Sequence, residues 1–316
     1  MLHQIGRELG DVECVYTPHY TDGYLEVLNR FGLLNFSVAG HGGQFRMKTE
    51  AYLRDHGLPV DAEGKLGDYD LVVTGSDLII QRNIRHKPIV LVQEGMTDPE
   101  NLAYHLVRYL KLPRWIASTS ATGLSLAYRK FCVASDGYRS FFEEKGVPVE
   151  RLEVTGIPNF DNCARLREND YPDRGFVLVA TSDTRETLKF DSRKRFLQWT
   201  KAKVAGRRAL FRLHPNENAE RSTREIREVF PDAVVTQTGN TEHMIANCEA
   251  LVTQYSTCVY VGLALGKECH SYFDVQQLAR LVPMQNGGTS AHRIANVCRA
   301  LLQEQTVQRA WEQAAS

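Results

Sequence analysis

Short apolar runs of four to six residues alternate along the chain with longer segments of mixed polarity. Such runs, bounded by Gly, Pro or Asp, predict buried strands, and the mixed segments between them predict helices. The predicted strands lie near 12–16, 34–39, 69–74, 88–92, 114–117, 131–134, 176–180, 208–213, 233–236, 250–253 and 268–272. The alternation predicts an α/β protein with largely parallel sheets and helices on both faces.

The predicted strands fall into two groups, which indicates two domains. A chain of 316 residues is long enough to fill two cores of ordinary size. The segment Gly156-Ile-Pro-Asn-Phe-Asp and the polar stretch after it separate the groups. We expect a first domain over 1–157, a linker over 158–174, a second domain over 175–289 and C-terminal helices over 290–316, near 290–303 and 305–314.

Composition excludes several classes of protein. Lys plus Arg and Asp plus Glu both total 38, which gives zero formal net charge and argues against a general nucleic-acid binder. No apolar run approaches the roughly 18 residues of a membrane-spanning helix, and the first residues do not form a signal-peptide pattern. The seven cysteines are scattered and lack a Cys-x-x-Cys pair, which favours reduced thiols over a zinc site. We expect a cytoplasmic protein with at most peripheral membrane contact.

Two strand ends in the second half carry candidates for anion binding. His214 follows the apolar run 209–211, and Pro215 ends that strand because proline cannot extend the ladder. Ser256 and Thr257 follow the run 250–253 and can cap a helix that begins near Cys258. Hydroxyls and free N–H groups at a helix start bind anions. Each feature alone has a purely structural interpretation, but together they favour a phosphate site.

A carboxylate follows a strand in the first half. The run 88–92 ends in Gln93, Glu94 and Gly95, a turn that would present Glu94 at the strand's carboxyl end. A carboxylate placed there can act as a general base on an acceptor hydroxyl. Alternatively, Glu94 caps a helix that starts near Pro99, a role that Thr97 or Asp98 would fill better.

These motifs resemble a known superfamily. The pattern of a strand with His-Pro, then Thr253-Gln-Tyr-Ser-Thr, then a helix that ends in Leu265-Gly-Lys before another strand, is similar to the nucleotide-binding half of GT-B proteins. Among these it resembles the CDP-glycerol glycerophosphotransferases, the bacterial sialic-acid and Kdo transferases, and the non-hydrolysing UDP-GlcNAc 2-epimerases. The resemblance covers most of residues 69–275 through short motifs. It implies two Rossmann-like domains whose parallel sheets face an interdomain cleft, with the last helices packed back on the first domain.

The resemblance also implies a donor site in the second domain. A CMP-, CDP- or UDP-linked sugar would bind there without a metal or other cofactor. Arg185 lies in a loop similar to one that faces the diphosphate in the epimerases, although Ser182 or Asp183 can instead simply cap the following helix. The residues expected to bind the nucleotide or its phosphates are Thr181, Ser182, Arg185, His214, Pro215, Ser256 and Thr257. The candidates for sugar or acceptor contact are His41, Thr97, Thr119 and Asp274, of which Asp274 can equally cap the next helix.

The reaction that the resemblance favours is inverting transfer of a sugar to a glycan or lipid-linked acceptor, with Glu94 as the base. Its acidic-Gly turn is similar to that of the sialic-acid and Kdo transferases. This implies a role in cell-surface polysaccharide biosynthesis, in the cytoplasm or at the inner membrane face. An epimerase would carry Gly-Gly-x-x-Glu-Glu after the serine, where this chain has Ser256-Thr-Cys-Val-Tyr-Val-Gly. A polyol-phosphate transferase would carry a His-Gly turn at Glu94. A non-catalytic nucleotide-binding relative is a further alternative.

The amino end departs from the GT-B pattern. Such proteins open with a strand, whereas residues 1–9 already form a helical pattern. Either the opening strand of the first sheet is missing from this sequence, or the domain is pared down. In the first case an uncovered sheet edge would favour self-association.

Overall fold

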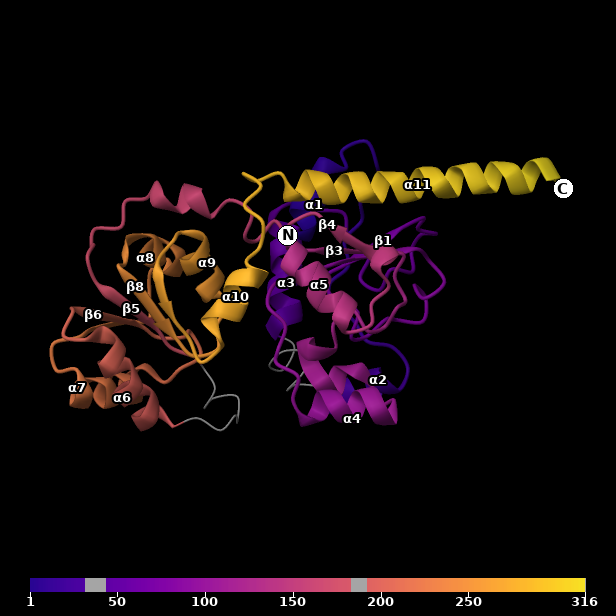
Figure 1. Ribbon diagram of the computed structural model, residues 1–316. Coiled ribbons are helices and arrows are strands. Elements are labelled where there is room, and N and C mark those ends of the chain that lie inside the picture. Colours follow the sequence, from indigo (N-terminus) through magenta and orange to yellow (C-terminus); the bar gives the residue numbers. More distant parts are fainter. Residues whose placement is uncertain (32–43, 183–191, 316) are drawn as a thin grey trace. The chain divides into compact units, whose positions relative to one another are not determined.

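The computed structural model describes residues 1–31, 44–182 and 192–315 (Figure 1). The chain divides into two compact units. Unit 1 comprises Met1–Asn159 together with Thr289–Ser316, and unit 2 comprises Phe160–Gly288. Each unit contains its own parallel sheet with helices packed against it, so the predicted α/β class is confirmed.

Among the described residues, the sheet of unit 1 has four parallel strands in the order β1-β2-β3-β4. They are β1 (Val72–Thr74), β2 (Ile89–Val92), β3 (Lys130–Val133) and β4 (Leu152–Val154). Every residue of β2 is buried, as expected for a strand covered on both faces. The helices of this unit are α1 (Leu2–Glu8), α2 (Tyr24–Arg30), α3 (Gln44–Asp55), α4 (Leu102–Leu110), α5 (Asp136–Glu144) and α11 (Ser290–Ala315), with 3₁₀ segments η2 (Arg114–Ala121) and η3 (Val149–Arg151).

The two ends of the described chain pack together in unit 1. Ile5 of α1 and Ile294 of α11 belong to one buried cluster, which also contains Val90 and Val92 of β2. The Arg299 guanidinium pairs with the Asp11 carboxylate at 2.6 Å beside this contact. The later turns of α11 extend away from the rest of the unit (Figure 1).

In the part of unit 2 that the structure describes, five parallel strands follow the order β7-β6-β5-β8-β9. They are β5 (Val177–Ala180), β6 (Ala209–Arg212), β7 (Val234–Thr236), β8 (Ala250–Thr253) and β9 (Glu268–His270). The helices are α6 (Arg193–Val204), α7 (Ala219–Val229), α8 (Thr241–Asn247), α9 (Cys258–Ala264) and α10 (Val275–Leu281), with a 3₁₀ segment η4 (Cys163–Arg167).

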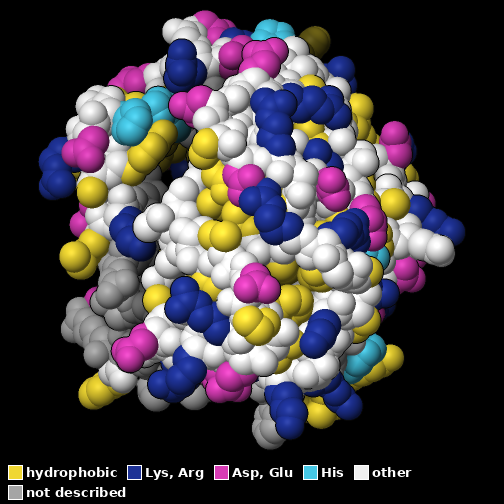
Figure 2. Space-filling view, turned by 90° about the vertical axis from the view of Figure 1, so that its left-hand side faces the viewer, with side chains coloured by type: hydrophobic (Ala, Val, Ile, Leu, Met, Phe, Trp, Pro, Cys, Tyr) yellow, Lys and Arg dark blue, Asp and Glu magenta, His cyan; other side chains and the backbone are white. Residues whose placement is uncertain are grey.

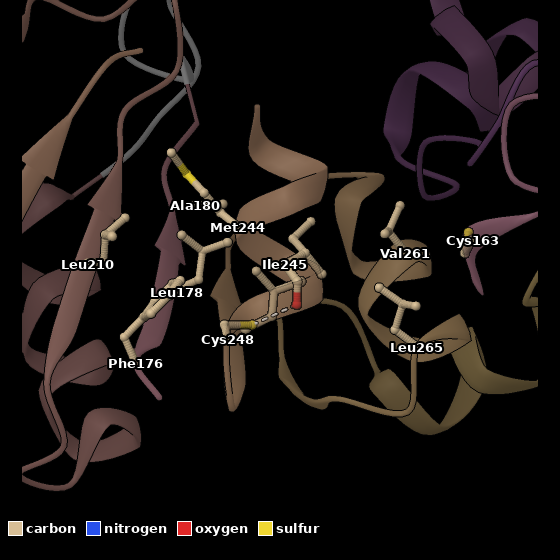
Figure 3. Close-up of a cluster of buried hydrophobic side chains, with 11 residues drawn as sticks. Cys163, Phe176, Leu178, Ala180, Leu210, Met244, Ile245, Cys248, Val261 and Leu265 are labelled. Atoms are coloured by element: carbon tan, nitrogen blue, oxygen red, sulfur yellow. Dashed lines mark hydrogen bonds between the residues drawn. The ribbon is translucent and has the colours of Figure 1, made fainter. Parts of the chain in front are cut away.

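Alternate residues of β5 build the two cores of unit 2, because successive side chains of a strand point to opposite faces. Leu178 and Ala180 pack with Met244 and Ile245 of α8 and with residues of α9 (Figure 3). Val177 and Val179 instead pack with residues of α6 and α7. The approach of α9 to the sheet is close: a Cβ added at Gly262 would lie 2.7 Å from Cys269 Sγ.

Several predictions about elements were wrong. Residues 114–117 form part of η2 and not a strand, and near 12–16 the structure has only an isolated bridge between Tyr16 and Val60. Strand β4 was not predicted. The two expected C-terminal helices form a single helix, α11. The strand expected at 34–39 lies outside the described residues, and the remaining predicted strands are present, several of them shorter than expected.

Charged side chains are mixed over the surface. Figure 2 shows Lys and Arg side chains spread over the viewed face, with Asp and Glu side chains between them. This mixture agrees with the zero formal net charge of the sequence. Within the described ranges, no helix has the length and apolar character needed to cross a membrane.

Candidate functional site

The strand order of unit 2 reverses beside β5, with β6 on one side and β8 on the other. In open α/β sheets, ligands bind at the carboxyl ends of the strands where the order reverses. Two buried side chains join the strand ends at this point. Ser182 Oγ, after β5, donates a hydrogen bond to Gln254 Oε1, after β8, at 2.8 Å. The main-chain carbonyl of Gln254 in turn accepts from Ser271 Oγ at 2.7 Å, which ties in the end of β9.

A buried carboxylate fixes the ends of β5 and β6. Glu217 Oε2 accepts hydrogen bonds from Thr181 Oγ1 and, at 2.9 Å, from the His214 N–H. Glu217 Oε1 forms an ion pair with Arg193, and both side chains are almost completely buried. Buried charges require a partner of this kind, since an isolated charge would be strongly disfavoured. Gln237 Nε2 adds hydrogen bonds to the carbonyls of His214 and Glu217 at 2.9 and 2.8 Å.

The imidazole of His214 is oriented by its own loop. Its Nδ1 accepts a hydrogen bond from the Asn216 N–H at 3.2 Å. An accepting Nδ1 carries no proton, so the neutral ring has its N–H at Nε2 and can donate there. Pro215 follows directly and precedes α7. His214 therefore presents a hydrogen-bond donor at the same sheet edge as Thr181 and Ser182.

The loop after β8 contains Ser256 and Thr257. Ser256 Oγ accepts a hydrogen bond from the Cys258 N–H at 3.4 Å, whereas Thr257 stands at the N-cap position of α9 without a side-chain capping bond. Asp274 caps α10: its Oδ1 accepts from the N–H groups of Gln276 and Gln277 at 2.9 and 3.3 Å. The sequence left two roles open for Asp274, sugar contact and helix capping, and the structure shows the helix cap.

In unit 1, Glu94 follows β2 at the carboxyl edge of the sheet. Its side chain lies directly against Gly75, which follows β1, because a Cβ added at Gly75 would be 2.3 Å from Glu94 Oε1. The Glu94 carbonyl accepts from Asn159 Nδ2 at 3.1 Å. The buried Gln93 side chain holds the same turn by donating to the Gly95 carbonyl at 2.8 Å and accepting from the Ala134 N–H at 2.9 Å.

The environment of Glu94 favours a role in proton transfer. Nearby protein atoms displace water from its carboxyl and raise its pKa above the ordinary value. The side chain as a whole is exposed, so we expect this rise to be modest. A raised pKa brings a carboxylate closer to the range in which a general base is most effective at neutral pH.

A second segment of unit 1 contacts the turn after Glu94. Thr119 Oγ1 donates to Asp98 Oδ2 and accepts from the Asp98 N–H, both at 2.9 Å. Thr119 therefore lies beside the loop that contains Thr97, which is half-buried. Ser118 adopts φ 52° and ψ −150°, a conformation that non-glycine residues rarely adopt and that often occurs at functional sites.

The expected start of α4 near Pro99 was wrong, because Asn101 caps this helix by accepting from the Tyr104 N–H at 3.1 Å.

His41 and Arg185 lie outside the described residues. Glu217, Arg193, Gln254 and Gly75 were not among the residues predicted from the sequence. Glu217 stands three positions after His214, in the same motif, which is the signal that could have identified it. Within the part of the chain that the structure describes, no group of three or more His, Cys, Asp or Glu side chains could hold a metal ion.

No family model matches the chain, and no curated protein matches its sequence. Solved structures do match. The UDP-GlcNAc 2-epimerase from Neisseria meningitidis, solved with UDP-GlcNAc bound, has 11% sequence identity and a TM-score of 0.51, with 94% of this chain and 95% of that chain covered. A provisionally assigned UDP-N-acetylglucosamine 2-epimerase from Listeria monocytogenes has 10% identity and a TM-score of 0.51, with 91% and 82% covered. The chain has the GT-B fold.

A more distant GT-B match is the wall teichoic acid polymerase TagF, solved as its H444N variant, with 12% identity, a TM-score of 0.42 and coverage of 75% of this chain and 74% of that chain. Identities this low show the fold alone. The GT-B fold accounts for the two parallel sheets and for candidate residues at the carboxyl edge of each sheet. The reaction has to be argued from the residues themselves.

Proposed function

We propose that this protein is a glycosyltransferase that moves a sugar from a nucleotide-activated donor to a glycan or lipid-linked acceptor. The observation that carries the proposal is the polar carboxyl edge of unit 2, where the strand order reverses and Thr181, Ser182 and His214 come together. The hydroxyl protons of Thr181 and Ser182 are donated to Glu217 and Gln254, so these two residues fix the strand ends, and the imidazole of His214 supplies a donor beside them. The phosphate of a CDP-, UDP- or CMP-linked sugar suits a donor placed at this edge.

In the proposed reaction the ring N–H of His214 stabilises the charge that develops on the departing nucleotide. Prearranged N–H and O–H groups are effective in this role because they need no reorganisation as the charge forms. Ser256 and Thr257 would add hydroxyls from the loop after β8. Arg185 would add a planar guanidinium that can bind a phosphate through two hydrogen bonds. With these contacts, the proposed transfer needs no metal ion and no further cofactor.

Glu94 is the proposed general base. It would remove the proton from the acceptor hydroxyl as the oxygen attacks the anomeric carbon, which gives inversion. The acceptor would lie near Thr97 and Thr119 beside the Glu94 turn, with His41 as a further candidate contact. The proposed setting is cell-surface polysaccharide synthesis in the cytoplasm, at or near the inner membrane face.

A second candidate function is sugar-nucleotide epimerisation. It is favoured by the names of the two structures that match at a TM-score of 0.51. It is opposed by the segment after Ser256, where Val259, Tyr260 and Val261 are buried and no Glu is present. The two reactions differ in products: a transferase releases the nucleotide, whereas an epimerase returns an isomer of the same mass.

The first experiment is a thermal-shift panel with CMP, CDP, UDP, GDP and ADP on the wild type, His214→Ala and a control, His292→Ala, in unit 1. Ligand binding stabilises the folded state by roughly 2.7 kcal/mol at a hundredfold excess over the dissociation constant. We expect a shift with one pyrimidine nucleotide that is lost in His214→Ala and kept in His292→Ala. No shift with any nucleotide would contradict the proposal and favour a non-catalytic protein.

The second experiment separates the reactions. Once the base is known, sugar nucleotides that carry it are incubated with the wild type and with Glu94→Gln. Release of free nucleotide that Glu94→Gln abolishes, with nucleotide affinity nearly unchanged, supports the transferase. An isomer of unchanged mass supports the epimerase. If the base is cytosine, a parallel incubation with CDP-glycerol that transfers glycerol phosphate and releases CMP supports a polyol-phosphate transferase. Undiminished turnover by Glu94→Gln would show that the proposed base is wrong.

A further inference from the structure

An exposed apolar stripe runs along α4. Leu102, Leu106, Tyr109 and Leu110 stand at positions i, i+4, i+7 and i+8, which places them on one side of a helix. Their exposed fractions are 74%, 42%, 77% and 63%. These values are high for four large apolar side chains on a single helix face.

The opposite side of the same helix is already buried. Tyr104 and Val107 pack with Leu78, Ala117 and Ala121 in a core cluster of unit 1. A helix that is apolar on both sides normally has both sides covered. The inner side therefore packs α4 into the fold, whereas the outer stripe has no apolar cover from the described residues and suits contact with another apolar surface.

The stripe continues onto neighbouring segments. Trp115 of η2 packs against both the α4 cluster and the cluster that contains Leu25 of α2. The two helices lie at the same end of unit 1 in Figure 1. We call the exposed apolar side chains of this region the α2–α4 face: Tyr24, Val27, Phe31, Leu102, Leu106, Tyr109, Leu110, Leu112 and Ile116. Large apolar patches of this kind mark interaction sites for proteins or membranes.

The charge of the α4 part of the face distinguishes these partners. The segment from Asn101 to Ile116 contains Arg108, Lys111 and Arg114 and no Asp or Glu, in a chain whose formal net charge is zero. Arg108 and Lys111 are exposed; Arg108 donates a hydrogen bond to Tyr104 Oη and has the Glu100 carboxylate nearby, just before this segment. Apolar side chains flanked by cations match the boundary between the acyl chains and the anionic headgroups of a bilayer. The aromatic rings of Tyr24 and Tyr109 suit the same interface.

We propose that the α2–α4 face docks on the surface of an anionic lipid bilayer. The leucine and tyrosine side chains enter the headgroup boundary, and Arg108 and Lys111 lie at the lipid phosphates. The chain rests on the membrane without crossing it. The proposal depends neither on nucleotide binding nor on turnover, so it can be tested apart from the proposed function.

The test is flotation of the purified full chain with vesicles of phosphatidylcholine alone or mixed with phosphatidylglycerol. We expect binding to the anionic vesicles that weakens as salt is raised, because salt screens the cations. Leu106→Glu combined with Leu110→Glu should lower the bound fraction by at least about tenfold, since charged side chains do not enter the headgroup boundary. Leu66→Glu is the matched control, because Leu66 is 83% exposed in the same unit but outside the α2–α4 face.

Circular dichroism spectra and melting curves of all variants establish that they fold. Lys111→Glu should weaken binding to the anionic vesicles and leave any binding to neutral vesicles unchanged. Failure of the wild type to bind at low salt, or equal losses in Leu66→Glu, would overturn the proposal. So would a wild-type dimer that the double variant dissociates without any vesicle binding, since the occupant of the face would then be a second copy of the chain.

Discussion

Glu217 connects the ends of two strands in unit 2. Its carboxylate contacts Thr181 after β5, the main chain of His214 after β6, and the guanidinium of Arg193 on α6. Removal of one member of such a pair leaves the other charge buried without compensation, which costs far more than the pair itself contributes. The residue therefore stabilises the fold and positions the candidate site.

We predict that Glu217→Ala lowers the free energy of unfolding of unit 2 by about 3–5 kcal/mol. Urea denaturation measures this change. Glu220→Ala is the control, because Glu220 is exposed on α7 and should change stability by less than about 0.5 kcal/mol. Equal losses of stability in Glu217→Ala and Glu220→Ala would show that the buried ion pair between Glu217 and Arg193 does not stabilise unit 2.

Glu94 gives a prediction about pH. The folded protein raises the pKa of this carboxyl, so its proton is lost at a higher pH than usual. A general base acts in its ionised form, hence kcat/KM should be constant above the raised pKa and decline as the pH falls through it. A pH–rate profile of the wild type tests this. Absence of that decline in the wild-type profile, or undiminished turnover by Glu94→Gln, would show that another group is the base.

Gly75 gives a test of geometry. An alanine Cβ at this position would lie 2.3 Å from Glu94 Oε1, so the carboxylate would have to move away from the end of β1. We predict that Gly75→Ala reduces kcat at least about tenfold, as small displacements of a catalytic group commonly do. Since the end of a flexible side chain is all that must move, the melting temperature should change little. Unchanged kcat would show that the position of Glu94 against Gly75 is not needed.

The residues of the candidate site were predictable only in part. Strand ends of a parallel sheet meet at one edge, so Thr181, Ser182, His214 and Ser256 could be grouped from the sequence. The roles of Arg193 and Gln254 arise from contacts 24 and 72 residues away along the chain. No local pattern reports such contacts. Thr119 was among the predicted residues, but its hydrogen bonds to Asp98 depend on the fold of η2.

At the level of elements, strands covered on both faces were the best predicted. Runs such as 177–180 and 250–252 are apolar throughout because helices pack on both sides of β5 and β8. The run at 114–117 has three apolar residues after Arg114, yet only Ala117 of it is buried and the segment forms a 3₁₀ helix after Pro113. Short apolar runs do not distinguish these outcomes. Strand β4 escaped prediction because only Leu152 of its three residues is buried.

The contact between α1 and α11 gives a prediction about an element. Ile294 is fully buried against Ile5 and the β2 valines. Truncation of such a side chain removes its transfer energy and leaves a cavity, so Ile294→Ala should lower the stability of unit 1 by about 2–5 kcal/mol. Val307→Ala is the control, since Val307 is exposed on the same helix. Urea denaturation measures the unfolding free energy of both variants. A large loss in Ile294→Ala alone indicates packing, whereas similar changes in both variants indicate helix propensity.

For the whole molecule, the two separate cores predict two unfolding transitions. Each unit has its own sheet and its own buried clusters. In differential scanning calorimetry, Ile294→Ala should lower one transition, and a nucleotide that binds unit 2 should raise the other by mass action. A single transition that responds to both changes would show that the units unfold as one.

The division of unit 1 between the two ends of the chain affects its synthesis. Ile5 and Ile294 share one core but stand near opposite ends of the described chain, so α1 is synthesised long before α11. At roughly 5–20 residues per second, α1 waits on the order of 15 to 60 seconds for α11. Unit 2 is continuous and can fold on the ribosome before unit 1 is complete. Throughout that interval α1 lacks its contact with α11, and its apolar side can pack only on residues made before α11, such as the β2 valines, which makes this helix a candidate site for chaperone binding.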